Sequence, residues 1–276
     1  MSGAAKRSSA SQGGSDRRKK KYRSDGTPIW GKRFIDGPGI WVTCAKGKEK
    51  QAVGEIYDLF NTLAEEMWPE KQDAADTKSD DAEDEEELSI EAQIANEVSA
   101  MKKPKAEQRF ANCQTNTPCL IFISCKSPVD PVALVMRYLH DVAKTGITRT
   151  RHCLRFCPVS ASSVTNMPEI EAVCRKLVGS PDVIRLQYKI ELKMRNHTTI
   201  PRDTLIEAIA KCVPEGHSVD LSNPDVFVLV ELFKSVCGVS VVREYNRLHK
   251  FNVVEIASVR AKKEDGPEET SNRIAS

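Results

Sequence analysis

The chain has 276 residues, of which 40% are hydrophobic and 29% are charged, enough for one large or two small folded units. No apolar run approaches the roughly 18 residues that a membrane-spanning helix needs, and the basic, Ser/Gly-rich start is unlike a secretory signal. We therefore expect a soluble intracellular protein with no membrane partner and with its nine cysteines reduced. Lysine and arginine total 41 against 39 aspartates and glutamates, so the placement of the charges matters more than their sum.

Residues 1–30 are mostly small and polar and carry one dense basic run. Six of the eight residues from 16 to 23 are lysine or arginine. Such a run is typical of a nuclear address or of a tail that binds nucleic acid, and a merely solubilising tail is the alternative. We expect disorder here and a nuclear or nucleolar location.

The first predicted elements are a strand and a helix. Residues 39–44 are rich in β-branched and aromatic side chains, which favours a strand. Residues 52–67 then repeat apolar side chains at the i, i+3, i+4 spacing of a helix, and Pro69 ends it.

An acidic insert follows at 70–88. From 70 to 87, ten acidic residues face two lysines and almost nothing is apolar. This composition predicts a solvated segment without a folded core. It is either a plain spacer or a competitor of RNA for a basic surface.

Strands and helices then alternate to the end of the chain. The helix at 131–144 has Asp130 as its predicted N-cap and Gly146 just past its end. The last strands are too close in sequence for helical crossovers, so we expect α/β with mixed pairing in two packed subdomains that divide near 160–167. The other predicted elements are strands at 119–124, 153–159, 183–196, 217–221, 225–232 and 236–243, and helices at 168–178 and 202–213.

Motifs that mark catalysis or cofactor binding are missing from the sequence. It has no GxGxxG, no GxxxxGK[ST] and no GxSxG, and its cysteines form no CxxC pair. Neighbouring carboxylates occur only in the acidic insert, where nothing would desolvate them. We therefore expect no enzyme activity, no cofactor and no metal, with a zinc site assembled from distant residues as the alternative.

The predicted strand at 183–196 carries a row of cations on one face. Its even positions are apolar from Ile184 to Met194, and its odd positions include only one acid. Alternation would place the first set in the core and the second on the surface, where cations can follow a phosphate backbone. An ordinary solvated face is the alternative. The cations at the odd positions are Arg185, Lys189, Lys193 and Arg195.

A second basic cluster precedes and enters the strand at 153–159. It contains Lys144, Arg149, Arg151 and Arg155, and no acid occurs between Asp141 and Glu169. Guanidinium groups bind phosphate oxygens in pairs, and few aromatic residues lie among these cations. This pattern favours a folded RNA over stacked single-stranded bases. The candidate RNA-binding residues are Arg149, Arg151, Arg155, Lys176, Lys189, Lys193 and Arg195.

Several segments of the sequence together resemble those of a known family. They are Thr145-Gly146 with the arginines before Pro158, the run through Tyr188-Lys189-Ile190, the stretch from Val219 to Asp225, and Gly238 to Val242 followed by Tyr245 and Lys250-Phe251-Asn252. With these segments, residues about 128–258 resemble the THUMP domain, an RNA-binding module of tRNA-modifying enzymes. The resemblance implies an α/β (α+β) fold: a ferredoxin-like subdomain over 31–160, a THUMP core over 161–258 and a polar tail over 259–276.

By layout the chain resembles the eukaryotic THUMP-domain adaptors of the tRNA cytidine acetyltransferase. The resemblance implies a non-catalytic protein that binds leucine and serine tRNAs and presents them to an ATP-dependent RNA cytidine acetyltransferase, which forms N4-acetylcytidine from acetyl-CoA. The sequence ends about twenty residues past Ile256, which we expect to leave no room for the catalytic domain of other THUMP proteins. The alternative is a subunit of another tRNA-modification enzyme, such as a methyltransferase. Arg149, Arg151 and Arg155 match the family's basic motif.

Overall fold

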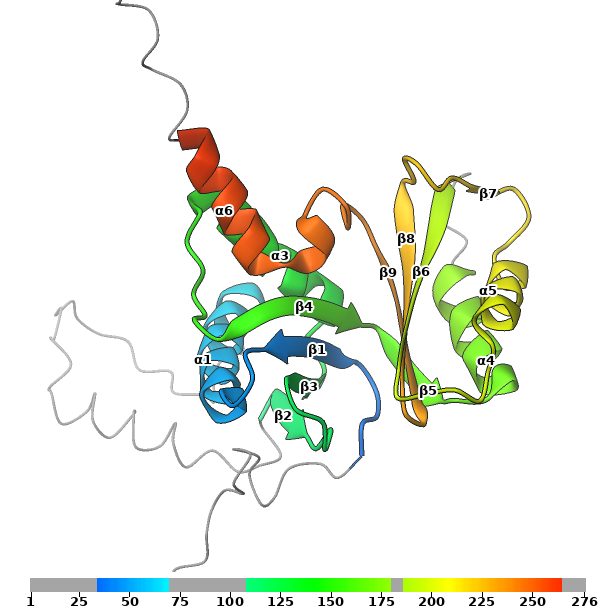
Figure 1. Ribbon diagram of the computed structural model, residues 1–276, viewed down its shortest axis with the longest axis horizontal. Coiled ribbons are helices and arrows are strands. Elements are labelled where there is room, and N and C mark those ends of the chain that lie inside the picture. Colours follow the sequence, from blue (N-terminus) through cyan, green and yellow to red (C-terminus); the bar gives the residue numbers. More distant parts are fainter. Residues whose placement is uncertain (1–33, 70–107, 180–185, 265–276) are drawn as a thin grey trace, which may run out of the picture.

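The computed structural model describes residues 34–69, 108–179 and 186–264, which form two sheets with helices packed on them (Figure 1). The predicted basic tail at 1–30 and the acidic insert at 70–88 lie outside these residues. So does the stretch from 265 onward, although the first residues of the predicted polar tail, 259–264, end a helix. None of the described helices is long and apolar enough to cross a bilayer.

The first sheet has the ferredoxin-like arrangement. Strands β1 (Gly39–Cys44), β2 (Phe110–Cys113), β3 (Leu120–Cys125) and β4 (Cys153–Val159) pair antiparallel in the order β2-β3-β1-β4. Helices α1 (Glu49–Met67) and α3 (Pro131–Thr145) follow β1 and β3 and pack on one face of the sheet. The ferredoxin-like fold predicted for this part of the chain is confirmed, although its strand β2 was not predicted.

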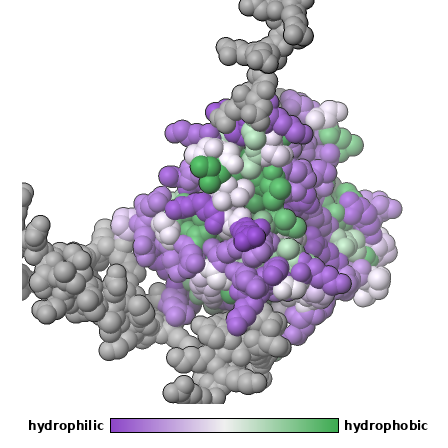
Figure 2. Space-filling model, turned by 60° about the vertical axis from the view of Figure 1, so that its left-hand side comes forward, coloured by the Kyte–Doolittle hydropathy of each residue, from purple (hydrophilic) through white to green (hydrophobic). Residues whose placement is uncertain are grey.

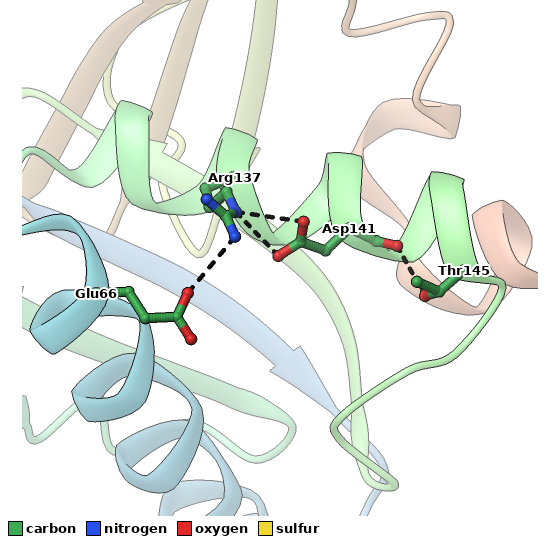
Figure 3. A network of polar contacts seen from close by, with 4 residues as sticks. All are labelled: Glu66, Arg137, Asp141 and Thr145. Atoms are coloured by element: carbon green, nitrogen blue, oxygen red, sulfur yellow. Dashed lines mark hydrogen bonds and ion pairs between the residues drawn. The ribbon is translucent and has the colours of Figure 1, made fainter.

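Helix α3 begins and ends where its sequence signals predict. The carboxylate of Asp130 accepts a hydrogen bond of 3.0 Å from the backbone N–H of Val132, and Gly146 ends the helix with a left-handed φ of 71°. On its exposed side, Arg137 donates to Asp141 at 3.1 Å and reaches Glu66 of α1 at 3.5 Å (Figure 3). All three side chains are more than a third exposed, so this network joins the two helices but adds little stability.

The second sheet is mixed, as predicted. Its order is β5-β9-β8-β6-β7, where β6 pairs parallel with β7 and β8, and β9 pairs antiparallel with β8 and β5. Helices α4 (Met167–Val178) and α5 (Arg202–Lys211) cover one face. The strands are β5 (Ala161–Val164), β6 (Gln187–Arg195), β7 (Ser218–Val219), β8 (Val226–Phe233) and β9 (Val236–Val242).

The opposite face of the second sheet packs against the first subdomain. Phe227 and Leu229 of β8 belong to the core beneath α1 and α3, while the ring of Phe233 lies 5.1 Å from that of Trp41 in β1. Both faces of β8 are therefore covered, and all eight of its residues are buried. This double burial explains why β8 reads as an apolar run, interrupted by Glu231, without polar alternation.

After β9 the chain returns to the first subdomain. Tyr245, the 3-10 helix η1 (His249–Phe251) and helix α6 (Val253–Glu264) join the core that α1, α3 and the first sheet enclose. Tyr245 and Phe251 are fully buried there and meet edge to face at 5.0 Å. The sequence did not predict this return, because it placed residues up to 258 with the second subdomain.

Gly39 lies where no side chain fits. A Cβ atom at this position would lie 2.5 Å from the carbonyl oxygen of Ile123 and 2.5 Å from the ring of Phe122. We expect Gly39→Ala to lower the free energy of unfolding by about 1–3 kcal/mol because the strand or the ring must shift. Gly54 is the control, since it lies on exposed α1 surface with nothing within 4 Å. Gly54→Ala should raise stability by roughly 0.5–1 kcal/mol, and equal urea midpoints for the two variants would contradict this packing.

Candidate nucleic-acid interface

The loop from 146 to 152, here called the arginine loop, carries two of the predicted RNA-binding residues. The side chains of Arg149 and Arg151 are exposed, whereas Thr150 between them is 5% exposed. The hydroxyl of Thr150 lies 3.3 Å from that of Tyr138 in α3, within hydrogen-bonding distance. The backbone thus alternates outward, inward and outward, which presents both guanidinium groups to solvent.

The start of the arginine loop is fixed by the end of α3. Thr145 donates its hydroxyl to the carbonyl oxygen of Asp141 at 2.8 Å (Figure 3) and accepts the backbone N–H of Ile147 at 3.2 Å. Gly146 donates its N–H to the carbonyl of Val142 at 2.8 Å. These bonds satisfy groups that a helix terminus otherwise leaves unpaired, and they set the direction in which the chain departs.

The end of the arginine loop is fixed by helix α1 and by Ala45, the residue that follows β1. One oxygen of Glu55, Oε2, accepts the backbone N–H groups of Arg151 and His152 at 3.0 and 2.9 Å. The carbonyl of His152 accepts the N–H of Ala45 at 3.0 Å. The backbone of the loop is therefore held at both ends.

The surface around this loop is mainly polar. The side of the molecule that carries the loop is turned forward in Figure 2, where hydrophilic groups surround a smaller hydrophobic area. Ile147 and Leu154, on either side of the arginines in sequence, are exposed hydrophobic side chains. Within the described residues, neither Arg149 nor Arg151 forms an ion pair with an acidic side chain. Among the residues that the structure describes, no acidic side chain therefore neutralises these two charges.

Arg155 differs from the two loop arginines. It lies within β4 opposite Thr43 and is half-buried, and its backbone forms an isolated bridge with Asn252. Its Nε is buried and, among the described residues, has no hydrogen-bond partner. By alternation it shares a face of the sheet with Cys157, toward the second sheet. Arg155 is therefore close in sequence to the arginine loop but is not part of its exposed surface.

The remaining candidates lie in the second subdomain. Lys176 is exposed on α4, and Lys189 of β6 donates to the carbonyl of Leu221 at 3.2 Å. Arg195 is half-buried at the end of β6. Figure 1 places α4 and β6 on the opposite side of the molecule from the arginine loop between α3 and β4. The structure therefore does not gather the predicted residues into one continuous patch.

Lys193 shows that the predicted row of solvent-facing cations on β6 is wrong at this position. Its side chain is only 21% exposed, and its Nζ lies 3.1 Å from Glu231 and 3.6 Å from Sγ of Cys157. Burial alone would lower the pKa of Lys193, but the neighbouring Cys157 and Glu231 favour the ammonium, and the net shift is upward. At Lys193, this face of β6 meets β4 and Tyr245 instead of water.

The apolar face of β6 is as predicted, with Tyr188 and Leu192 buried against α4 and α5. Sequence reasoning missed two residues that shape the arginine loop, Thr150 within it and Glu55 on helix α1. Thr150 could have been found, because it separates the two arginines in a regular alternation. Glu55 could not, because no local pattern connects it to a backbone 96 residues further along the chain.

The cysteines are poorly suited to catalysis. All nine are free, and all but Cys119 are buried. Burial raises the pKa of Cys157 to about 12 and that of Cys44 to about 12, so these thiols are protonated at neutral pH and are weak nucleophiles. Within the described ranges, no three His, Cys, Asp or Glu side chains are grouped so that they could hold a metal.

Comparison with known proteins identifies the second sheet. The family model described as THUMP domain matches residues 164–242, from the last residue of β5 to the last residue of β9. This match lies within the predicted THUMP core, so the predicted order of a ferredoxin-like subdomain followed by a THUMP domain is confirmed.

Similarity to whole proteins extends beyond that domain. Uncharacterized protein C25H2.10c of Schizosaccharomyces pombe is 30% identical over 224 residues, which cover 79% of this chain and 75% of that protein. The tRNA acetyltransferase TAN1 of Saccharomyces cerevisiae is 29% identical over 253 residues, covering 82% and 87%. The human THUMP domain-containing protein 1 is 29% identical over 228 residues, covering 79% and 63%. Because identity near 30% extends over most of both subdomains, this chain belongs to the family of THUMP domain-containing proteins.

Proposed function

We propose that this protein binds tRNA and presents it to a separate cytidine acetyltransferase, which forms N4-acetylcytidine, and that it performs no catalysis itself. Leucine and serine tRNAs are the proposed substrates. The similarity to the protein named tRNA acetyltransferase TAN1 supports the link to acetylation. The THUMP domain at 164–242 supports the choice of RNA as ligand.

The arginine loop is the observation that carries the binding half of this proposal. Arg149 and Arg151 stand on a backbone that is fixed at both ends, and their guanidinium groups have no acidic partner within the described residues. Fixed guanidinium groups suit pairs of phosphate oxygens. The loop contains no Phe, Tyr or Trp on which an unstacked base could lie, and its His152 is only 20% exposed, so contacts to the backbone of a folded RNA fit better.

The non-catalytic half rests on the chemistry of the side chains. Burial raises the pKa of the Cys153 thiol beside the arginine loop, and it raises the pKa of Cys157 to about 12, so these thiols are protonated at neutral pH and are weak nucleophiles. The name of TAN1 makes catalysis by this chain the competing hypothesis. A third possibility is service to a different tRNA-modifying enzyme.

Reconstitution separates these hypotheses. The purified protein is incubated with leucine or serine tRNA, acetyl-CoA and ATP, with and without a separately purified RNA cytidine acetyltransferase. We expect the protein alone to bind tRNA with an affinity that falls as salt rises, and N4-acetylcytidine to form only when both proteins are present. Product with this chain alone would establish catalysis.

Cells that lack the protein provide the second arm of the test. We expect N4-acetylcytidine to disappear from purified leucine and serine tRNA, as measured by mass spectrometry of nucleosides. Unchanged N4-acetylcytidine would overturn the proposal. Loss of another modified nucleoside instead would point to service of a different enzyme.

A further inference from the structure

We propose that Glu55 is a positioning residue of the RNA-binding site, because its carboxylate fixes the backbone from which Arg149 and Arg151 reach the tRNA. The inference deepens the proposed function and rests on it. It assigns a role to an acidic residue on a different element, helix α1, that the sequence does not connect to the arginine loop.

The geometry around Glu55 is that of an anchor. Its Oε2 accepts two successive backbone N–H groups, those of Arg151 and His152, at 3.0 and 2.9 Å. The same oxygen lies 3.9 Å from Sγ of Cys153, and Oε1 lies 3.9 Å from Nε2 of His152. The side chain of Glu55 is only 23% exposed, so these hydrogen bonds to a charged acceptor are partly shielded from water and stronger than exposed ones.

Helix α1 holds the anchor in place. Ala52 and Ile56, on either side of Glu55, are fully buried in the core beneath the first sheet. The carboxylate therefore cannot follow the loop if the loop moves. With Thr145 and Gly146 fixing the start of the loop, Glu55 fixes its end, and only the intervening residues remain to adjust to RNA.

The sign of the charge makes this role testable. A carboxylate close to a phosphate-binding surface repels the ligand, so a purely electrostatic effect of removing it would strengthen tRNA binding. If Glu55 positions the loop, replacing it with a residue that cannot accept a hydrogen bond should instead weaken tRNA binding. Alanine and glutamine both remove the negative charge, but only glutamine keeps an oxygen that can accept the two N–H groups.

The experiment compares Glu55→Ala, Glu55→Gln and the control Glu65→Ala, which removes an exposed carboxylate from the same helix. Affinity for leucine tRNA is measured at several salt concentrations, and thermal unfolding is recorded for each variant. We expect Glu55→Ala to bind roughly tenfold more weakly. Glu55→Gln and Glu65→Ala should bind as tightly as the parent protein or more tightly.

A readout independent of RNA accompanies the binding assay. Amide hydrogen exchange of the peptide that spans 147–153 should become faster in Glu55→Ala and stay slow in Glu55→Gln. If the parent protein failed to bind tRNA, the proposed function would fail, yet this exchange comparison would still test the anchor. If Glu55→Ala does not fold, Glu55→Asp replaces it, since it keeps the charge but shortens the reach and should also weaken binding.

Three results would overturn the inference. The first is tighter or unchanged binding by Glu55→Ala, which would leave only an electrostatic effect. The second is equal weakening by Ala and Gln, which would show that an acceptor oxygen at this position does not restore binding. The third is a loss of binding that merely parallels the unfolded fraction of each variant, which would make Glu55 a general stabilising residue.

Discussion

The double substitution Arg149→Ala/Arg151→Ala should weaken tRNA binding by roughly a hundredfold at low salt, because removing each charge-assisted hydrogen-bonding group costs about tenfold in affinity. Both side chains are exposed, so the free energy of unfolding should stay within about 0.5 kcal/mol of the parent protein. The dependence of log Kd on log salt should also become shallower by about 2, since each arginine that contacts a phosphate releases about one counterion.

Two control variants separate the effect of the positive charge from that of the paired hydrogen-bond donors and from that of any exposed arginine. Arg149→Lys/Arg151→Lys keeps the charge but not the paired donors, so it should retain the salt dependence while losing part of the affinity. Arg247→Ala removes an exposed arginine that is already paired with Glu244 at 2.8 Å, and it should leave binding unchanged. Arg155 is left intact because it is half-buried, and its loss would also disturb packing. Parent-like affinity and salt dependence in the double alanine variant would remove the arginine loop from the interface.

Lys193→Met should destabilise the protein by about 3–5 kcal/mol, because it leaves a buried carboxylate without its partner. Glu231 is only 9% exposed, and its Oε1 lies 3.1 Å from Nζ of Lys193. Lys193→Met/Glu231→Leu removes both charges and should recover most of the loss, which is the comparison that separates ion pairing from packing. The measurement is urea unfolding; a parent-like midpoint for Lys193→Met would show that the pair is not effectively buried.

The pH dependence of this pair follows from the direction of its shift. The pKa of Lys193 is raised in the folded protein, so its stabilising contribution is complete below the usual lysine value of about 10.4. It is lost only as the pH rises through the higher folded value. In the parent protein, stability measured between pH 6 and 9 should therefore show no change from this group.

Elements with strong local signals were predictable from the sequence. Helix α3 has an N-cap, a proline at its first position and a terminal glycine, and α1 has an unbroken apolar stripe. Strands β2 and β5 were missed because each has only four residues. Three of the four in β5 are alanine or serine, which carry no strand preference, so its place was decided by pairing with β9.

The sequence did not predict which distant segment of the chain packs against a given face of a strand. Alternation correctly separated the two faces of β6, but it could not tell whether the face of Lys193 meets water or β4. The same limit applies to the interface. The outward direction of Arg149 and Arg151 is implicit in the local pattern, whereas the anchor provided by Glu55 exists only after α1 and β4 have come together.

The return of the chain after β9 has a consequence for biogenesis. The core of the first subdomain includes Tyr245, Leu248, Phe251, Val253 and Ile256, which are synthesised some hundred residues after β4. When the strands of the first sheet have been synthesised, these residues have not, so part of the apolar surface of the first subdomain stays exposed to solvent. It is covered only after the THUMP domain has also left the ribosome. The two subdomains are consequently expected to fold as one cooperative unit, and a chain cut just after β9 should be a substrate for chaperones and proteases, not a stable fragment.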